Sequence, residues 1–219
     1  LGEAKYGLFS AQESGRAGRS FQALRLVGDA RDQNVGAMLT RVRRPFLGRE
    51  ATVLGLDHNW RPTARWNLRS RLFGSRIDQA GDRSSDLGAS VWADYEMDGG
   101  WRQQWIGMHF GDELEINDAG YLARNDLNYL HWQVSRRVTG LPPGSRLASI
   151  DWRGRISSSH NNHGDRLEDQ LRLSAQAQLR DGASAYAQLN IDSAGVDDLL
   201  LRGNGRVRLP ARSSLYVEY

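Results

Sequence analysis

Residues 170–180, QLRLSAQAQLR, decide the fold because apolar and polar side chains alternate strictly along them. The apolar positions are Leu171, Leu173, Ala175, Ala177 and Leu179. A β-strand points successive side chains to opposite faces, whereas a helix would bring the polar residues round to the apolar side. The stretch therefore predicts a strand with one apolar face and one polar face.

The same alternation recurs along the chain and predicts about thirteen strands. We expect them to start near Lys5, Ser20, Val35, Glu50, Arg65, Asp86, Trp101, Asp126, Arg146, Leu167, Ala185, Leu201 and Ser214. Tight connections at 61–64, 97–100, 140–145, 180–184 and 210–213 alternate with longer ones at 77–85, 111–125, 157–166 and 192–204. One rim of tight turns and one rim of long loops is typical of an antiparallel up-and-down transmembrane β-barrel, so we expect an all-β fold of 12 to 14 strands.

Composition bounds the function. The 219 residues carry a net charge of +3, with acids and bases interleaved, and lack a basic stripe or a recognition motif, which argues against nucleic-acid binding. No apolar run approaches the roughly 18 residues of a membrane helix. There is no cysteine, so disulfides and thiol catalysis are excluded. We expect one domain over residues 1–219.

Arginine supplies almost all of the positive charge, since Lys5 is the only lysine. A genome rich in G and C explains this, and so does a polar lumen or a rim that binds phosphate-bearing lipids. Tryptophans fall near strand ends or on apolar faces, as in the aromatic girdles of membrane barrels; the alternative is a soluble barrel that has them in its core. They are Trp60, Trp66, Trp101, Trp105, Trp132 and Trp152.

Charged residues recur on the polar faces of the expected strands. In a barrel they would line the lumen, where they either form a salt-bridged wall or orient polar solutes. These candidate lumen-lining residues are Arg65, Arg69, Arg71, Asp94, Glu96, Asp151, Arg153 and Arg155.

Three stretches carry a resemblance to a known family: AKYGLF at 4–9, VRRPFLGREATVLGLDHNWRP at 42–62 and GMHFGDELEINDAGYLARNDL at 107–127. Together they resemble an uncharacterised outer-membrane β-barrel family of Gram-negative bacteria, over roughly residues 1–138. The third stretch looks like the signature loop of the family, with matches at Phe110, Asp112, Asn117, Gly120, Tyr121, Arg124, Asn125 and Asp126.

The resemblance implies a location in the bacterial outer membrane. Membrane lipid, lipopolysaccharide and the barrel-insertion machinery are the implied partners. The family barrel usually follows a domain that resembles a family-nine carbohydrate-binding module, and glycans or an unknown protein partner are implied only through that domain. The sequence lacks it and is shorter than the usual barrel. Because single-chain bacterial barrels have even strand numbers, thirteen strands predict either that the chain is a fragment of a longer one or that one strand is wrong.

Three sites of chemistry are conceivable. The acids Asp112, Glu113, Glu115 and Asp118 could hold calcium, but their spacing matches no calcium loop, and we favour a structural loop that Tyr121 anchors and in which Arg124 pairs with an acid. His160 and His163 lie in a polar segment that we expect to be a solvated loop rather than a metal site. His131, Asn128 and Ser135 could form a hydrolase site, although they share one strand.

We therefore expect no catalytic residue, no metal and no cofactor. The favoured function is an outer-membrane barrel that serves as a conduit, receptor or surface scaffold. A soluble β-barrel or sandwich that binds glycans is the first alternative, and a barrel hydrolase is the second.

Overall fold

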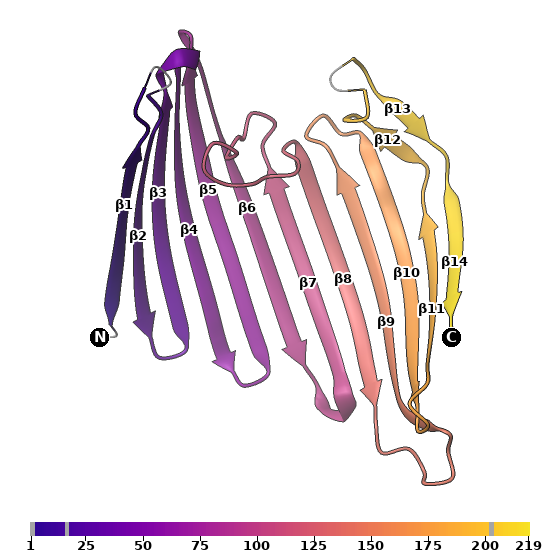
Figure 1. The fold of residues 1–219 in the computed structure, drawn as a ribbon. Helices are drawn as coiled ribbons and strands as arrows, with labels where there is room; N and C mark the ends of the chain where they lie inside the picture. Colours follow the sequence, from indigo (N-terminus) through magenta and orange to yellow (C-terminus); the bar gives the residue numbers. More distant parts are fainter. Residues whose placement is uncertain (1–2, 16–17, 202–203) are drawn as a thin grey trace. The chain divides into compact units, whose positions relative to one another are not determined.

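The computed structural model describes residues 3–15, 18–201 and 204–219 (Figure 1). Nearly all of its regular structure is β-strand, with two 3₁₀ turns, η1 (Pro45–Leu47) and η2 (Asp98–Gly100). The strands are β1 (Ala4–Gln12), β2 (Ser20–Ala30), β3 (Gln33–Arg44), β4 (Arg49–Thr63), β5 (Trp66–Gln79), β6 (Asp82–Glu96), β7 (Trp101–Phe110), β8 (Leu127–Val138), β9 (Leu147–His160), β10 (Arg166–Leu179), β11 (Ser184–Asp192), β12 (Gly195–Asp197), β13 (Val207–Leu209) and β14 (Arg212–Glu218). No helix among the described residues has the length and apolar character needed to cross a membrane.

Twelve strands form one sheet in the order of the sequence, β1 to β11 and then β14 (Figure 1). The prediction of an all-β antiparallel fold with sequential pairing is confirmed, and most strands start within a few residues of the expected positions.

The expected order of tight and long connections fails on either side of β9, because the long connection expected at 157–166 spans only 161–165 and the tight one expected at 140–145 spans 139–146. Two further expectations about the strands were wrong. Among the described residues no strand begins at Leu201, which lies in a turn, and positions 202–203 lie outside them; that segment holds only the three-residue strand β13. The short strands β12 and β13 pair with each other instead, as a separate two-stranded sheet. The long connection expected at 77–85 is a two-residue turn at Ala80 and Gly81, since the charged residues on either side of it belong to β5 and β6.

The chain divides into two compact units. Unit 1 comprises Leu1–Trp92 and Met108–Asn128, and unit 2 comprises Ala93–Gly107 and Tyr129–Tyr219. Each unit is described by itself.

One face of unit 1 is apolar. Cross-strand partners place Leu8, Leu24, Leu39 and Leu54 in one row, and Tyr6, Leu26, Ala37, Leu56 and Leu72 in the next. These side chains are largely uncovered, with exposed fractions such as 78% for Leu8 and 51% for Leu54. We call this surface the apolar face of unit 1.

The opposite face of unit 1 is polar. Its side chains include Arg25 and Asp57, which form an ion pair with 2.9 Å between Nη2 and Oδ2, and Arg71, which stacks over Trp92 at 5.4 Å. Val42, Ala51 and Ile77 form a buried row across β3, β4 and β5 on this same face. We call it the polar face of unit 1.

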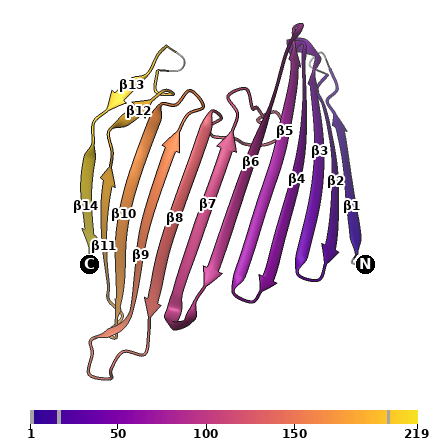
Figure 2. The same cartoon turned by 180° about the vertical axis from the view of Figure 1, so that it is seen from behind.

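Unit 2 has the same division. Ile156, Leu171 and Ile191 align across β9, β10 and β11 on its apolar face, followed by Leu173, Leu189 and Leu215 across β10, β11 and β14. The alternate positions, among them Arg153, Ser174 and Gln188, form its polar face. The alternation in the sequence therefore gives each unit one apolar face and one polar face. Figure 2 shows the strands of both units from behind.

Candidate functional site

The connection between β7 and β8, residues 111–126, folds onto the polar face of unit 1 and contacts β3 to β6. Leu114 is its centre: only 1% of the residue is exposed. A Cβ placed on Gly88 would lie 2.7 Å from Leu114 Cδ2 and 2.5 Å from Phe73 Cε2, so the absence of a side chain at Gly88 makes room for both. We call residues 111–126 the docked loop.

Ion pairs with Arg44 and Arg49 attach the docked loop to the sheet beside this apolar contact. Asp118, whose side chain is 5% exposed, accepts from Arg49 Nη2 at 2.6 Å and lies 3.1 Å from Arg44 Nε. Arg49 Nη2 also donates to Glu115 Oε1 at 2.6 Å. The hydrogen bond with Asp118 raises the pKa of Arg49, at the end of β4, above its ordinary value, so this guanidinium keeps its charge.

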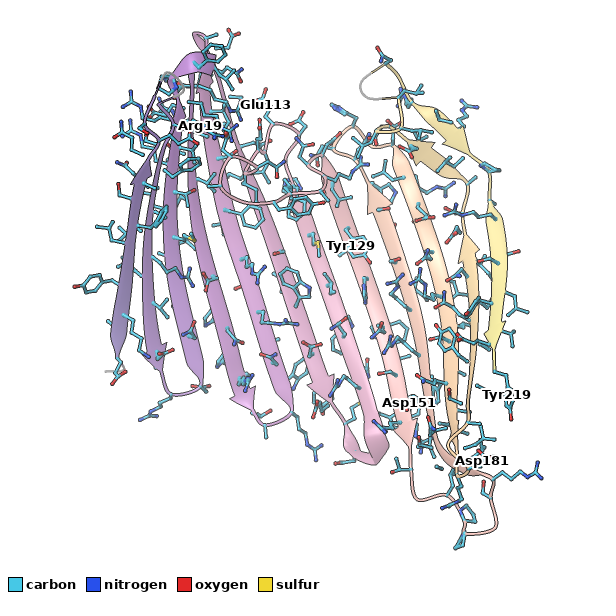
Figure 3. The ribbon with its side chains drawn as sticks, in the orientation of Figure 1. Arg19, Glu113, Tyr129, Asp151, Asp181 and Tyr219 are labelled. Carbon is cyan, nitrogen blue, oxygen red and sulfur yellow. The ribbon has the colours of Figure 1, made fainter. Side chains whose placement is uncertain are left out.

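Backbone groups complete the attachment. The Glu115 N–H donates to Ser75 Oγ at 3.0 Å, and the Glu113 N–H donates to Asp86 Oδ2 at 2.9 Å. A Cβ on Gly111 would overlap the Asp86 carboxylate at 1.9 Å, so a side chain there would displace the acceptor of the Glu113 N–H. Figure 3 shows Glu113 at the end of unit 1 where Arg19 also lies, near the tips of the strands.

The residues of the resembling signature hold the shape of the docked loop and make few of its contacts with the sheet. Asn117 Oδ1 accepts from the Leu122 N–H at 2.6 Å, and Asn125 Nδ2 donates to the Asp112 carbonyl at 2.6 Å. The Gly120 N–H donates to the Ile116 carbonyl at 2.9 Å.

The other signature residues lie at the ends of the docked loop or in solvent. Phe110 packs against Phe73 with ring centroids 5.7 Å apart. Arg124 Nη2 donates to the Asp126 carbonyl at 3.4 Å, and Asp126 has a φ of 49°. The expectation that Tyr121 anchors the loop was wrong, because Tyr121 is 83% exposed.

Sequence reasoning missed the anchors Leu114, Arg44 and Arg49. A signal was present, since Leu114 is an apolar residue between Glu113 and Glu115. Arg49 lies 66 and 69 positions from its partners Glu115 and Asp118, and no local pattern reveals such a pairing.

The acids of the docked loop do not converge on a cation site. Glu115 and Asp118 both point to Arg49, and no group of three or more His, Asp or Glu in the described part of the chain is arranged to hold a metal. The Asn161 side chain organises the 161–165 turn, accepting from the backbone N–H of His163 at 3.1 Å and of Asp165 at 2.8 Å. His163 therefore belongs to a built turn at the end of β9.

The candidate hydrolase residues are not brought together. His131 Nδ1 lies 3.0 Å from the Tyr129 hydroxyl, whereas Asn128 Oδ1 lies 2.8 Å from Nδ1 of His109. Ser135 is four residues along β8 from His131, a separation of about 13 Å at 3.3 Å per residue. The geometry assembles no nucleophile and base from these three residues.

Most of the candidate lumen-lining residues lie on the polar faces. Arg69 and Arg71 flank Trp92 in unit 1. In unit 2, Asp94 accepts from Gln104 Nε2 at 2.7 Å, Glu96 pairs with Arg102, and Arg155 donates to Gln170. Arg65 is the exception, because it lies in the turn between β4 and β5.

A polar hollow of about 460 Å³ lies in unit 2, beside the turn from β6 to β7. Its lining includes Arg102, Ser135, Arg137, Asp151, Arg153 and Tyr186. Arg137 Nε lies 3.9 Å from Asp151 Oδ2. Asp151 is labelled in Figure 3 toward the end of unit 2 that also carries Asp181.

The chain matches no protein-family model, no curated protein and no solved structure. The family resemblance of the three sequence stretches therefore stays a prediction, and the site is interpreted from its own geometry.

Proposed function

We propose that this chain forms the wall of a transmembrane β-barrel in a bacterial outer membrane, with its apolar faces toward lipid and its polar faces toward an aqueous lumen. In this proposal the docked loop narrows the lumen, and the protein acts as a conduit for polar solutes without catalysis of its own. The supporting observation is the exposed apolar face of each unit.

The distribution of burial supports lipid, rather than a protein core, as the cover of the apolar faces. The buried apolar residues among those described are Val42, Ala51, Ile77, Leu114 and Leu167. Three of these five lie on the polar face of unit 1, and Leu114 belongs to the docked loop. The leucine rows of the apolar face contribute none, which is the reverse of a water-soluble sheet protein.

The total solvent-accessible surface area also supports a covered apolar face. It measures 14601 Å², whereas a soluble monomer of 24.6 kDa is expected to expose about 10,000 Å². Exposed apolar side chains such as Leu8 and Leu54 contribute to this surface, and large exposed apolar patches mark an interface with lipid or protein.

Strand length and aromatic placement fit a membrane. Strands β2 to β10 have 10 to 15 residues, and a tilted transmembrane strand needs about 9–11. In unit 1, Trp60 and Trp66 flank the tight turn between β4 and β5, where a girdle is expected. In unit 2, Trp101 lies at the start of β7 and contacts Trp152 edge to face at 4.9 Å.

Both edges of the sheet are open, so closure into a barrel is part of the proposal. The strands β1 and β14 are each paired on one side, and all of their residues are exposed. Open edges do not occur in the hydrocarbon of a membrane, so the proposed barrel requires a partner strand for each edge.

Purification with and without detergent tests the proposal, and a matched pair of variants tests it independently. Leu56→Arg places a charge on the apolar face, and Thr40→Arg places the same charge on the polar face. In lipid the first change costs about 2–4 kcal/mol of stability near the midplane, whereas the second costs little. Urea unfolding of both variants in phospholipid vesicles measures the difference.

The proposal fails if the chain purifies without detergent as a monodisperse soluble protein. It also fails if Leu56→Arg and Thr40→Arg destabilise the folded state equally, since the two faces would then meet the same solvent.

A further inference from the structure

Four arginines form a charged band on the apolar face of unit 1, beside the leucine rows. Arg43 is opposite Glu50, and Glu50 is opposite Asp78; in the next row Arg41, Thr52 and Arg76 are aligned. Arg83, at the start of β6, joins the first of these rows through Asp78, with 2.6 Å between Nε and Oδ1. We call Arg41, Arg43, Arg76 and Arg83 the arginine band.

Two carboxylates organise the arginine band and leave it positive. Glu50 holds Arg41 at 2.7 Å and Arg43 at 3.1 Å. Asp78 holds Arg83 at 2.6 Å and Arg76 at 3.2 Å. Four cations against two anions leave two positive charges in excess within two adjacent cross-strand rows.

The guanidinium groups remain available to a ligand. Their side chains are 46% to 61% exposed, from Arg41 to Arg83. Each guanidinium has five N–H donors, and the contacts of Arg43, Arg76 and Arg83 with the acids are made through Nε. Fork-shaped donors in pairs suit the oxygen atoms of a phosphate group.

The band ends where exposed leucines begin. The row after Arg41 and Thr52 is Leu39 and Leu54, which are 42% and 51% exposed. Leu87 of β6, 61% exposed, lies on this face too, because a Cβ on Gly74 would be 2.9 Å from its Cδ2. A ligand that follows this surface therefore meets positive charge first and hydrocarbon next.

We propose that the arginine band binds the phosphate groups of an anionic membrane lipid whose acyl chains lie along the adjacent leucine rows. The inference rests on the proposed membrane location and names the lipid class that this face selects. An acidic protein would satisfy the arginines, but it would leave the leucine rows uncovered.

The test uses the full chain folded in nonionic detergent micelles and titrated with bisphosphorylated lipid A. Arg41→Gln combined with Arg76→Gln removes two charges and leaves Glu50 paired with Arg43 and Asp78 paired with Arg83. The control is Arg61→Gln with Arg65→Gln, which removes two charges at the opposite end of β4. We expect about a thirtyfold loss of affinity for the first double variant, from roughly a fivefold effect per arginine, and little change for the control.

Removing both phosphates from lipid A is expected to abolish the difference between the two double variants. Equal affinity losses in both, or unchanged binding of the dephosphorylated lipid by the unsubstituted chain, would overturn the inference. If the chain still requires detergent and resists unfolding in vesicles, the membrane proposal survives that result. A chain that is soluble without detergent would overturn both the membrane proposal and the lipid inference.

Discussion

Asp118 is the residue on which the docked loop depends most. It is nearly buried and faces two arginines, so Asp118→Asn leaves Arg49 and Arg44 short of a negative partner. Losing one partner of a buried pair is costly, and we expect the loop to lose about 2–3 kcal/mol of docking free energy.

Hydrogen exchange measures this loss at the Glu115 amide, which is protected by Ser75 only while the loop is docked. Asp112→Asn is the control, since it removes the same charge from an exposed position of the same loop. Equal protection in both variants would show that the Asp118 pairs do not hold the loop.

In the turn between β5 and β6, Ala80 has an unfavourable backbone conformation that a substitution can relieve. Ala80 has a φ of 52° and Gly81 a φ of 97°, a pair of positive angles that favours Asn-Gly over Ala-Gly. An L-residue other than Asn, Asp or Gly pays about 1–2 kcal/mol for this conformation, so Ala80→Asn is expected to stabilise the fold by about 0.5–1 kcal/mol. The urea midpoint of unfolding should rise for Ala80→Asn and fall for Gly81→Ala; a fall in both would refute the turn geometry.

The strands themselves could be predicted because period-two alternation is a local signal. The register of β10 with β9 and β11 follows the pattern of residues 170–180 closely. The extent of β5 and β6 could not be predicted, since Asp78 and Arg83 have the composition of a loop but pair with each other across the turn. The strand expected at Leu201 failed because three consecutive leucines, Leu199 to Leu201, carry no alternation.

The candidate site was predicted only in outline. The sequence indicated a structured acidic loop, and the docked loop is one. Its anchors come from strands far along the chain, as when Arg49 meets Asp118, and depend on the pairing of β3, β4 and β5. Local patterns specify each strand, whereas the cross-strand arrangement determines which polar residues become neighbours.

If the polar faces enclose a water-filled lumen, the docked loop limits the passage of ions through the whole molecule. Leu114→Ala with Asp118→Asn removes its apolar anchor and its main ion pair, so the loop should leave the sheet and single-channel conductance in planar bilayers should rise. Tyr121→Ala with Asp112→Asn is the matched control, because it truncates an exposed side chain and removes the same charge from the same loop. A rise in the first variant alone ties conductance to loop position rather than to charge. Equal conductance in both, with loop release verified by hydrogen exchange, would mean that the docked loop does not obstruct the path.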